Sequence, residues 1–412
     1  MQKEINISDI KEFYKTSPNK PVNILKKKII EIDNDFDIEI KSGKRYNQKS
    51  NARCWVYAGF NMILNNVAKN MDINILNLEF SSSYYAFYDY LERSNSTYQI
   101  IIDSKKNSIK DIRGLVSFSL ETQGNFETFK YITNKYGIIP KSCMKESKLE
   151  CDDKEFRWIF NNKIIDDIKK IMACKKNKNI DLYQLKKELL KENYDILCKA
   201  FGRPPISFSY DYFNTKNENI NITMTPIEFK NKYLTLNLND FIILENYPMY
   251  GRKYNNKYNY KNCKNVYYGV THNFVTVKMS VIKEAVIKQM KDGISVYSLL
   301  YTNKMRNWKK GIIDLSIYDL KNLNTNISDK KSLINLNQIY FMHAMCLRGI
   351  KFKNQKPILW KFENTYGTKN NNGFITLTDE VFDLFVLSVV VDKKYLTEEI
   401  ISIYNNGKVK DV

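Results

Sequence analysis

Three side chains of this sequence, Cys54, His343 and Asn364, are of the types that together perform nucleophilic catalysis. The chain contains only two histidines, so an acid–base mechanism that uses histidine depends on His272 or His343. His343 lies in the apolar segment IYFMHAMCLRGI, which predicts a strand, and Asn364 follows 21 residues later. Two antiparallel strands joined by a turn would place these side chains together, with the carboxamide oxygen accepting the Nδ1–H of the imidazole. The other ring nitrogen would then face a nucleophile.

Cys54 is the candidate nucleophile because it stands at the start of a segment with helical periodicity. We expect Ser50 or Asn51 to cap this helix, which places the thiol in its first turn. The field of a helix N-terminus and a nearby imidazolium both favour thiolate over thiol. Gln48, six positions earlier, could donate its side-chain amide, and with the backbone N–H of Cys54 it could form an oxyanion hole.

Each of these residues also has a purely structural interpretation. Cys54 is one of seven cysteines, and buried cysteines are usually inert. His343 could be a core histidine bonded to a neighbour, Asn364 a turn residue and Gln48 an ordinary loop residue. The cysteines form no Cys-x-x-Cys pair, so we expect no structural zinc site and a reducing compartment. The proposed chemistry needs no metal and no organic cofactor.

The elements that must position these residues change character along the chain. Helices are expected in EFSSSYYAFYDYLERSN, starting at Ser81 to Ser83, and in NFETFKYITNKYGIIP, ended by Gly137 and Pro140. Residues 141–200 are charged and helix-like, and residues 203–265 are irregular, which is typical of an insertion. Strands dominate after residue 270, in VTHNFVTVKM, ISVYSLLYT, ILWKFENTY and GFITLT, with one helix in SVIKEAVIKQMKDG. Helices followed by strands predict an α+β fold with a cleft between its halves.

Composition restricts the class of protein. The 412 residues are 43% hydrophobic, enough for a substantial core, and the net charge is +20. That charge is compatible with weak, non-specific binding of nucleic acid, although lysine enrichment throughout the chain explains it equally well. The N-terminus shows no apolar signal region and no apolar run approaches the length of a membrane span, so we expect a cytoplasmic protein without membrane contact.

Gln-x5-Cys-Trp, a strand histidine and Asn-x-x-Gly form an ordered set that resembles the papain-like cysteine peptidases. The segment NQKSNARCW is similar to Asn-Gln-Lys-Ser-Ser-Gly-Arg-Cys-Trp of the bleomycin hydrolase and aminopeptidase C family. Further similar blocks follow in the family's order, from residue 45 to about 405: LEFSSSYYAFYDYLERSN, NKYGIIPKSC, MTPIEFKNKY, MHAM, WKFENTYG and VVVDKKYLTEEI.

The resemblance implies a papain-like fold with a large, mostly helical insertion. It divides the chain into an N-terminal extension (1–44), a helical half with the nucleophile (45–145), the insertion (146–265) and a β-rich half (266–412). It makes Cys54 the nucleophile, His343 the general base and acid, Asn364 the group that orients His343, and Gln48 a donor to the oxyanion. Gly124 matches a family glycine whose backbone pairs with the substrate peptide.

Family members are cytoplasmic homohexamers that act on peptides in an internal basic channel, and some bind nucleic acid. The resemblance therefore implies a cytoplasmic aminopeptidase of bleomycin hydrolase type that forms hexamers. Two alternatives stay open. One is an endopeptidase or oligopeptide-releasing enzyme with an open cleft. The other is a non-catalytic, basic, oligomeric protein that binds nucleic acid.

The sequence departs from the family pattern in four places. Ala52 replaces a glycine before the nucleophile, and Tyr366 replaces the tryptophan that shields the His–Asn hydrogen bond. Residues 123–126, Gln-Gly-Asn-Phe, replace Gly-Gly-Gln-Trp. The C-terminus lacks the family's Trp-Asp-Pro-Met-Gly arm, whose terminal carboxylate holds the substrate's α-amino group. We therefore expect the carboxylate of Val412 to fall short of the cleft.

Overall fold

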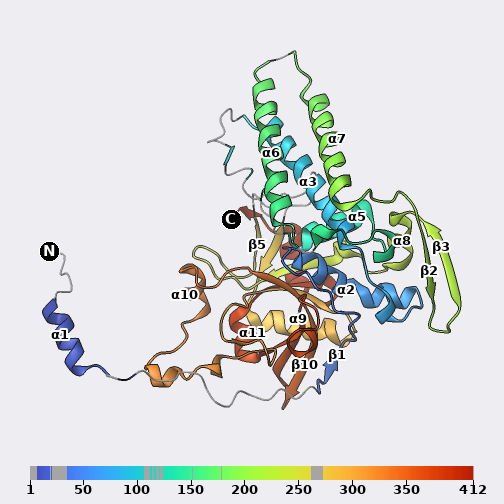
Figure 1. The fold of residues 1–412 in the computed structure, drawn as a ribbon. Helices are drawn as coiled ribbons and strands as arrows, with labels where there is room; N and C mark the ends of the chain where they lie inside the picture. The colour runs from blue at the N-terminus through green and yellow to red at the C-terminus, as the bar shows by residue number, and fades with distance from the viewer. Residues whose placement is uncertain are drawn as a thin grey trace.

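The computed structural model describes residues 7–18, 20, 35–105, 112, 113, 116, 120, 124–150, 152–177, 179–260 and 272–411. They form an α+β fold in which helices cover both faces of a large mixed sheet (Figure 1). One core cluster lies between these helices and the sheet, and a second lies on the opposite sheet face, under α9 (Met279–Lys291) and α11 (Asp379–Phe385). The predicted fold class is confirmed.

The helical half contains α2 (Cys54–Asn70), α3 (Ser82–Asp103), α5 (Phe126–Tyr136) and α8 (Pro226–Tyr233). Ser81 caps α3 by accepting a hydrogen bond from the backbone N–H of Tyr84, as its position in the sequence predicts. The α5 helix ends at Gly137, whose φ of 84° is a left-handed conformation that favours glycine. Helix α3 therefore begins where Ser81 predicts and α5 ends where Gly137 predicts, whereas α3 continues to Asp103, beyond the predicted segment that ends at Asn95.

The start of α2 differs from the prediction. Its N-cap is Arg53, without a side-chain cap, rather than Ser50 or Asn51. The Asn51 side chain instead accepts from the backbone N–H of Arg53 and forms a local turn just before the helix. Cys54 is consequently the first residue of α2, and almost all of the helix behind it is buried.

The main sheet has the order β14-β5-β6-β4-β13-β7-β10-β11-β12-β9-β8, with β1 also paired to β10. The two central strands match the predicted pair: β10 (His343–Lys353) and β11 (Lys356–Glu363) are antiparallel, with Cys346 opposite Glu363. The other strands are β1 (Ile38–Glu39), β4 (Phe241–Glu245), β5 (Asn256–Asn259), β6 (Asn273–Thr276), β7 (Val296–Leu300), β8 (Arg306–Asn307), β9 (Ile312–Ile313), β12 (Phe374–Thr378), β13 (Val386–Asp392) and β14 (Lys410–Asp411).

The segment 141–200 contains helices as predicted, and the described part of 203–265 is more ordered than the sequence predicts. The helices α6 (Lys154–Cys174) and α7 (Leu182–Phe201) form a hairpin that packs against α3 and projects from the body (Figure 1). The supposedly irregular stretch 203–265 holds the ribbon of β2 (Phe208–Phe213) and β3 (Asn219–Met224), and then β4 and β5 of the main sheet. These strands are short and separated by polar loops, which hides their signal. The division into four segments stays a prediction.

The remaining described helices are α1 (Ile7–Thr16), α10 (Lys330–Asn335) and α12 (Glu398–Asn406). Within the described ranges, no helix combines the length and the apolar character needed to cross a membrane.

Candidate active site

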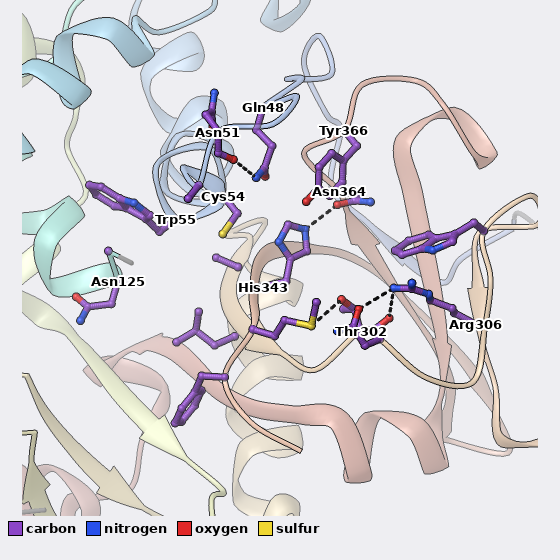
Figure 2. A pocket seen from close by; sticks show the side chains of 18 of the residues that line it. Gln48, Asn51, Cys54, Trp55, Asn125, Thr302, Arg306, His343, Asn364 and Tyr366 are labelled. Carbon is purple, nitrogen blue, oxygen red and sulfur yellow. Dashed lines mark hydrogen bonds between the residues drawn. The ribbon is translucent and has the colours of Figure 1, made fainter. Parts of the chain in front are cut away.

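A cavity of about 840 Å³ opens between the start of α2 and the edge of the sheet where β10 begins. All five predicted site residues line it: Gln48, Cys54, Gly124, His343 and Asn364. Figure 2 shows the Cys54 thiol from one wall facing the His343 ring from the other. The fold therefore brings together residues that are about 290 positions apart in the chain.

Cys54 and His343 shift each other's pKa in opposite directions. Burial raises the pKa of the Cys54 thiol, but the hydrogen bond and charge of His343, with backbone hydrogen bonds at Ala344 and Trp55, outweigh it. The pKa of Cys54 therefore lies below its ordinary value. Burial lowers the pKa of His343, but the hydrogen bond and charge of Cys54, with a hydrogen bond to Asn364 Oδ1, raise it overall. Both shifts favour a thiolate–imidazolium pair.

Asn364 lies 2.8 Å from His343, but at the ring nitrogen opposite to the predicted one. Its Oδ1 meets Nε2 rather than Nδ1. The reason is the reach of the ring: Nδ1 lies close to the backbone of β10 and faces Cys54, whereas the more distant Nε2 extends toward the end of β11. Tyr366 stacks on the imidazole with ring centroids 5.5 Å apart and covers this pair (Figure 2).

Gln48 is buried and connects the two walls of the cavity. Its Nε2 donates to the carbonyl of Asn51 at 2.8 Å, and its Oε1 accepts from the hydroxyl of Thr365. Its backbone N–H also donates to the Thr365 carbonyl at 2.7 Å. An amide nitrogen carries two hydrogens, and the bond to Asn51 uses one of them. The loop before Cys54 is thus fixed to the residue that follows Asn364.

Gly124 lies against Trp55, the residue after the nucleophile. A Cβ atom at position 124 would come within 2.2 Å of the Trp55 ring. Glycine is therefore required here by the contact with Trp55, whatever else approaches the backbone.

Comparison with known proteins agrees with this geometry. The profile of the Peptidase C1-like family matches residues 4–411. The chain belongs to this family. It is 30% identical to Aminopeptidase C of Listeria innocua over 380 residues, which is 90% of this chain and 85% of that protein. It is 29% identical to Aminopeptidase C of Listeria monocytogenes over 435 residues, covering 98% and 96% of the two chains.

A solved structure shows the same fold. The crystal structure of PepW from Lactobacillus rhamnosis superposes with a TM-score of 0.89 at 28% identity, covering 100% of this chain and 98% of that one. The resemblance to the aminopeptidase C and bleomycin hydrolase family, and with it the papain-like fold, is confirmed.

The departures from the family pattern lie around the same cavity. Ala52 and Tyr366 both line it, and the Tyr366 ring takes a shielding position over His343. At the C-terminus, β14 pairs in parallel with β5, which places Asp411 beside Asn259. Tyr260, the next residue along, lines the cavity. Gln123 and Val412 lie outside the described residues.

Other cavity residues, apart from His272, are ones that the sequence did not single out. Arg306 and Trp308 stack on each other at one end, with 4.7 Å from the guanidinium to the ring. Glu245, Tyr260 and His272 lie at another part of the wall. For Glu245 the sequence did contain a signal, because it is a charged residue at the end of the otherwise apolar strand FIILE.

Proposed function

We propose that this protein is a cysteine peptidase of the aminopeptidase C type, with Cys54 as nucleophile. The observation that carries the proposal is the alignment of Cys54, His343 and Asn364, in which hydrogen bonding and charge lower the pKa of the thiol and raise that of the imidazole. A thiolate next to an imidazolium is the reactive form of such a pair.

In this mechanism the Cys54 thiolate attacks the carbonyl carbon of the scissile bond. The other hydrogen of the Gln48 amide and the backbone N–H of Cys54 stabilise the tetrahedral oxyanion. The His343 imidazolium protonates the leaving amine, and the neutral ring then takes a proton from the water that hydrolyses the thioester. Asn364 holds the ring through Nε2 while Nδ1 exchanges protons, and the Gly124 backbone pairs with the substrate peptide.

The test compares Cys54→Ala with Cys198→Ala, because Cys198 is a half-buried cysteine that does not line the cavity. Both variants are assayed on aminoacyl-coumarin substrates. We expect activity to be abolished by the first substitution and retained by the second. Undiminished hydrolysis by the Cys54→Ala protein would overturn the assignment.

The family resemblance extends the proposal to location, assembly and specificity. It supports a cytoplasmic homohexamer that removes N-terminal residues from peptides. Comparison of free and N-acetylated peptides separates an aminopeptidase, which requires the free amine, from an enzyme with an open cleft, which accepts both.

A further inference from the structure

Glu245 is a buried carboxylate of which one oxygen accepts hydrogen bonds and the other, among the described residues, accepts none. Its Oε2 accepts from the Tyr260 hydroxyl at 3.1 Å and from Nη1 of Arg252 at 3.4 Å. Among the described residues, Oε1 has no hydrogen-bond partner. Nε2 of His272 lies 3.8 Å from Oε1, too far for a hydrogen bond, and among the described residues Nδ1 of that ring has no partner either. A buried acceptor without a donor is costly, so the vacancy requires an explanation.

The vacant oxygen belongs to a residue of the active-site cavity. Glu245, Tyr260 and His272 line the same cavity as Cys54 and His343. Phe341 joins the two parts, because it contacts the Tyr260 ring edge-on at 6.3 Å and lies two residues before His343. A molecule bound at Cys54 therefore has access to this part of the wall.

The register of the sheet gives the distance between Glu245 and the catalytic part of the cavity at His343. Glu245 of β4 lies opposite Ser388 of β13, Ser388 opposite Leu299 of β7, and Leu299 opposite Ala344, the neighbour of His343. Three strand spacings separate Glu245 from Ala344, which is about 14 Å. An extended peptide spans this distance with about four residues. A long side chain spans it when it belongs to a residue about two positions from the cleaved bond.

The chemistry of the site indicates which half of a bound peptide lies beside Glu245. The leaving nitrogen must meet the His343 ring, on which Tyr366 stacks, so the leaving half runs toward Tyr366. The acyl half runs the other way, along the wall of Trp55, which Figure 2 shows on the far side of Cys54 from His343, and of Gly124, which lies against Trp55. Leu299 and, beyond it, Glu245 continue the sheet wall below this half.

We propose that Glu245 binds a cationic group in the acyl half of the substrate, which is the side-chain ammonium or guanidinium of Lys or Arg, or the terminal ammonium of an oligopeptide. The inference rests on the proposed cysteine-peptidase chemistry and concerns substrates with at least two residues before the cleaved bond, which an enzyme with an open cleft accepts. A cation would donate to Oε1 and lie beside the rings of Tyr260 and His272. Arg252 does not take this place, because it binds the other oxygen and its guanidinium lies over the rings of Tyr247, Tyr260 and Phe274 at 5.2–5.4 Å.

The experiment uses two pairs of coumarin substrates. One pair carries Lys or norleucine two residues before the cleaved bond, and the other is a tetrapeptide with a free or an acetylated N-terminus. We expect the wild-type protein to prefer the cationic member of at least one pair by about 10- to 100-fold in kcat/KM, the value of a charged hydrogen bond. The pair that shows the preference identifies the source of the cation.

Two variants separate recognition from packing. Glu245→Gln should reduce the preference to about unity, whereas Arg252→Gln, which breaks the same ion pair but keeps the carboxylate, should retain it. No preference in the wild-type protein, or an equal loss on all substrates in both variants, would overturn the proposal, since Glu245 would then only support Arg252.

Binding to the Cys54→Ala protein keeps this test independent of the proposed function. Fluorescence anisotropy should show that the Lys peptide or the free-amine peptide binds more tightly than its neutral counterpart, and that Glu245→Gln removes the difference. This result supports the subsite even if no peptide is hydrolysed, and equal binding of all four peptides contradicts it.

Discussion

Two buried glutamates on the same sheet pair with arginines and have opposite surroundings. Glu363, at the end of β11, has both oxygens engaged: Arg348 donates from Nε at 2.7 Å, and Nη1 of Arg45 lies 3.4 Å away. Arg348 in turn donates to Asn65 and Ser295. Glu245, at the end of β4, keeps one oxygen vacant at a cavity wall.

The difference separates a structural ion pair from one that is open to a ligand. Glu363 precedes Asn364, so its closed network fixes the end of β11 from which Asn364 reaches His343. Glu245 has the same charge and comparable burial but fixes no catalytic group. The unpartnered carboxylate oxygen, rather than burial or charge, therefore distinguishes Glu245 from Glu363, although Nη2 of Arg348 also lacks a hydrogen-bond partner among the described residues.

The largest expected effect comes from breaking the closed pair. Arg348→Met leaves the Glu363 carboxylate buried without its main partner and should lower the free energy of unfolding by about 3–5 kcal/mol. Arg252→Met should cost at most about half as much, because Glu245 borders a cavity that water can enter. Urea denaturation measures both values. Equal losses of unfolding free energy in the two variants would show that the Arg348–Glu363 and Arg252–Glu245 pairs are both structural.

Asn364→Ala should have the next largest effect, this time on catalysis. Loss of a hydrogen bond to a charged ring corresponds to about 1.5–3 kcal/mol, or about 10- to 100-fold in kcat/KM. Asn364 raises the pKa of His343, so its removal lets the imidazolium lose its proton at lower pH. The alkaline limb of the pH–rate profile should therefore move to lower pH. Glu245→Gln should leave the alkaline limb at the same pH. A shift of the limb in that variant would show that Glu245, like Glu363, supports the catalytic residues.

Tyr366→Ala should have a smaller effect. The ring stacks on His343 at 23° between the planes, and an aromatic contact of this kind is worth about 0.5–1.5 kcal/mol. We expect kcat/KM to fall by about 2- to 10-fold, and Tyr366→Phe to keep full activity. If the phenylalanine variant loses as much as the alanine variant, the hydroxyl and not the stacked ring is responsible.

His272→Phe should have the smallest effect, and of opposite sign. It replaces a ring whose buried Nδ1 has no partner among the described residues by an apolar ring, so stability should stay equal or rise by up to about 1 kcal/mol. Thermal unfolding measures the change. A clear loss of stability would show that the imidazole has a structural partner. The Glu245 site would then be a structural hydrogen-bond network like that of Glu363.

The reactive residues could be predicted from sequence because they are few and ordered. With only two histidines, the spacing from His343 to Asn364 was informative, and the strand pair β10–β11 follows from it. Helix starts with a side-chain cap, such as Ser81, were also predictable, because the cap lies next to the helix it stabilises.

The features that could not be predicted depend on non-local geometry. The choice between Nδ1 and Nε2 of His343 follows from the distance between two strand ends, which no local pattern encodes. Glu245 reaches the cavity only because β4 inserts between β6 and β13, strands that follow it in the chain. The start of α2 at Cys54 has no side-chain cap, so the usual signal is missing.

The distance along the chain between Cys54 and His343 also sets when the thiol becomes reactive. A ribosome adds about 5–20 residues per second, so the roughly 290 residues between them take roughly 15–60 s to synthesise. Until His343 has emerged, the imidazole that lowers the pKa of Cys54 is absent, and the thiol behaves as an ordinary cysteine. The growing chain therefore carries its nucleophile in an unreactive form, and the ability to cleave peptides appears only after His343 and Asn364 have been synthesised.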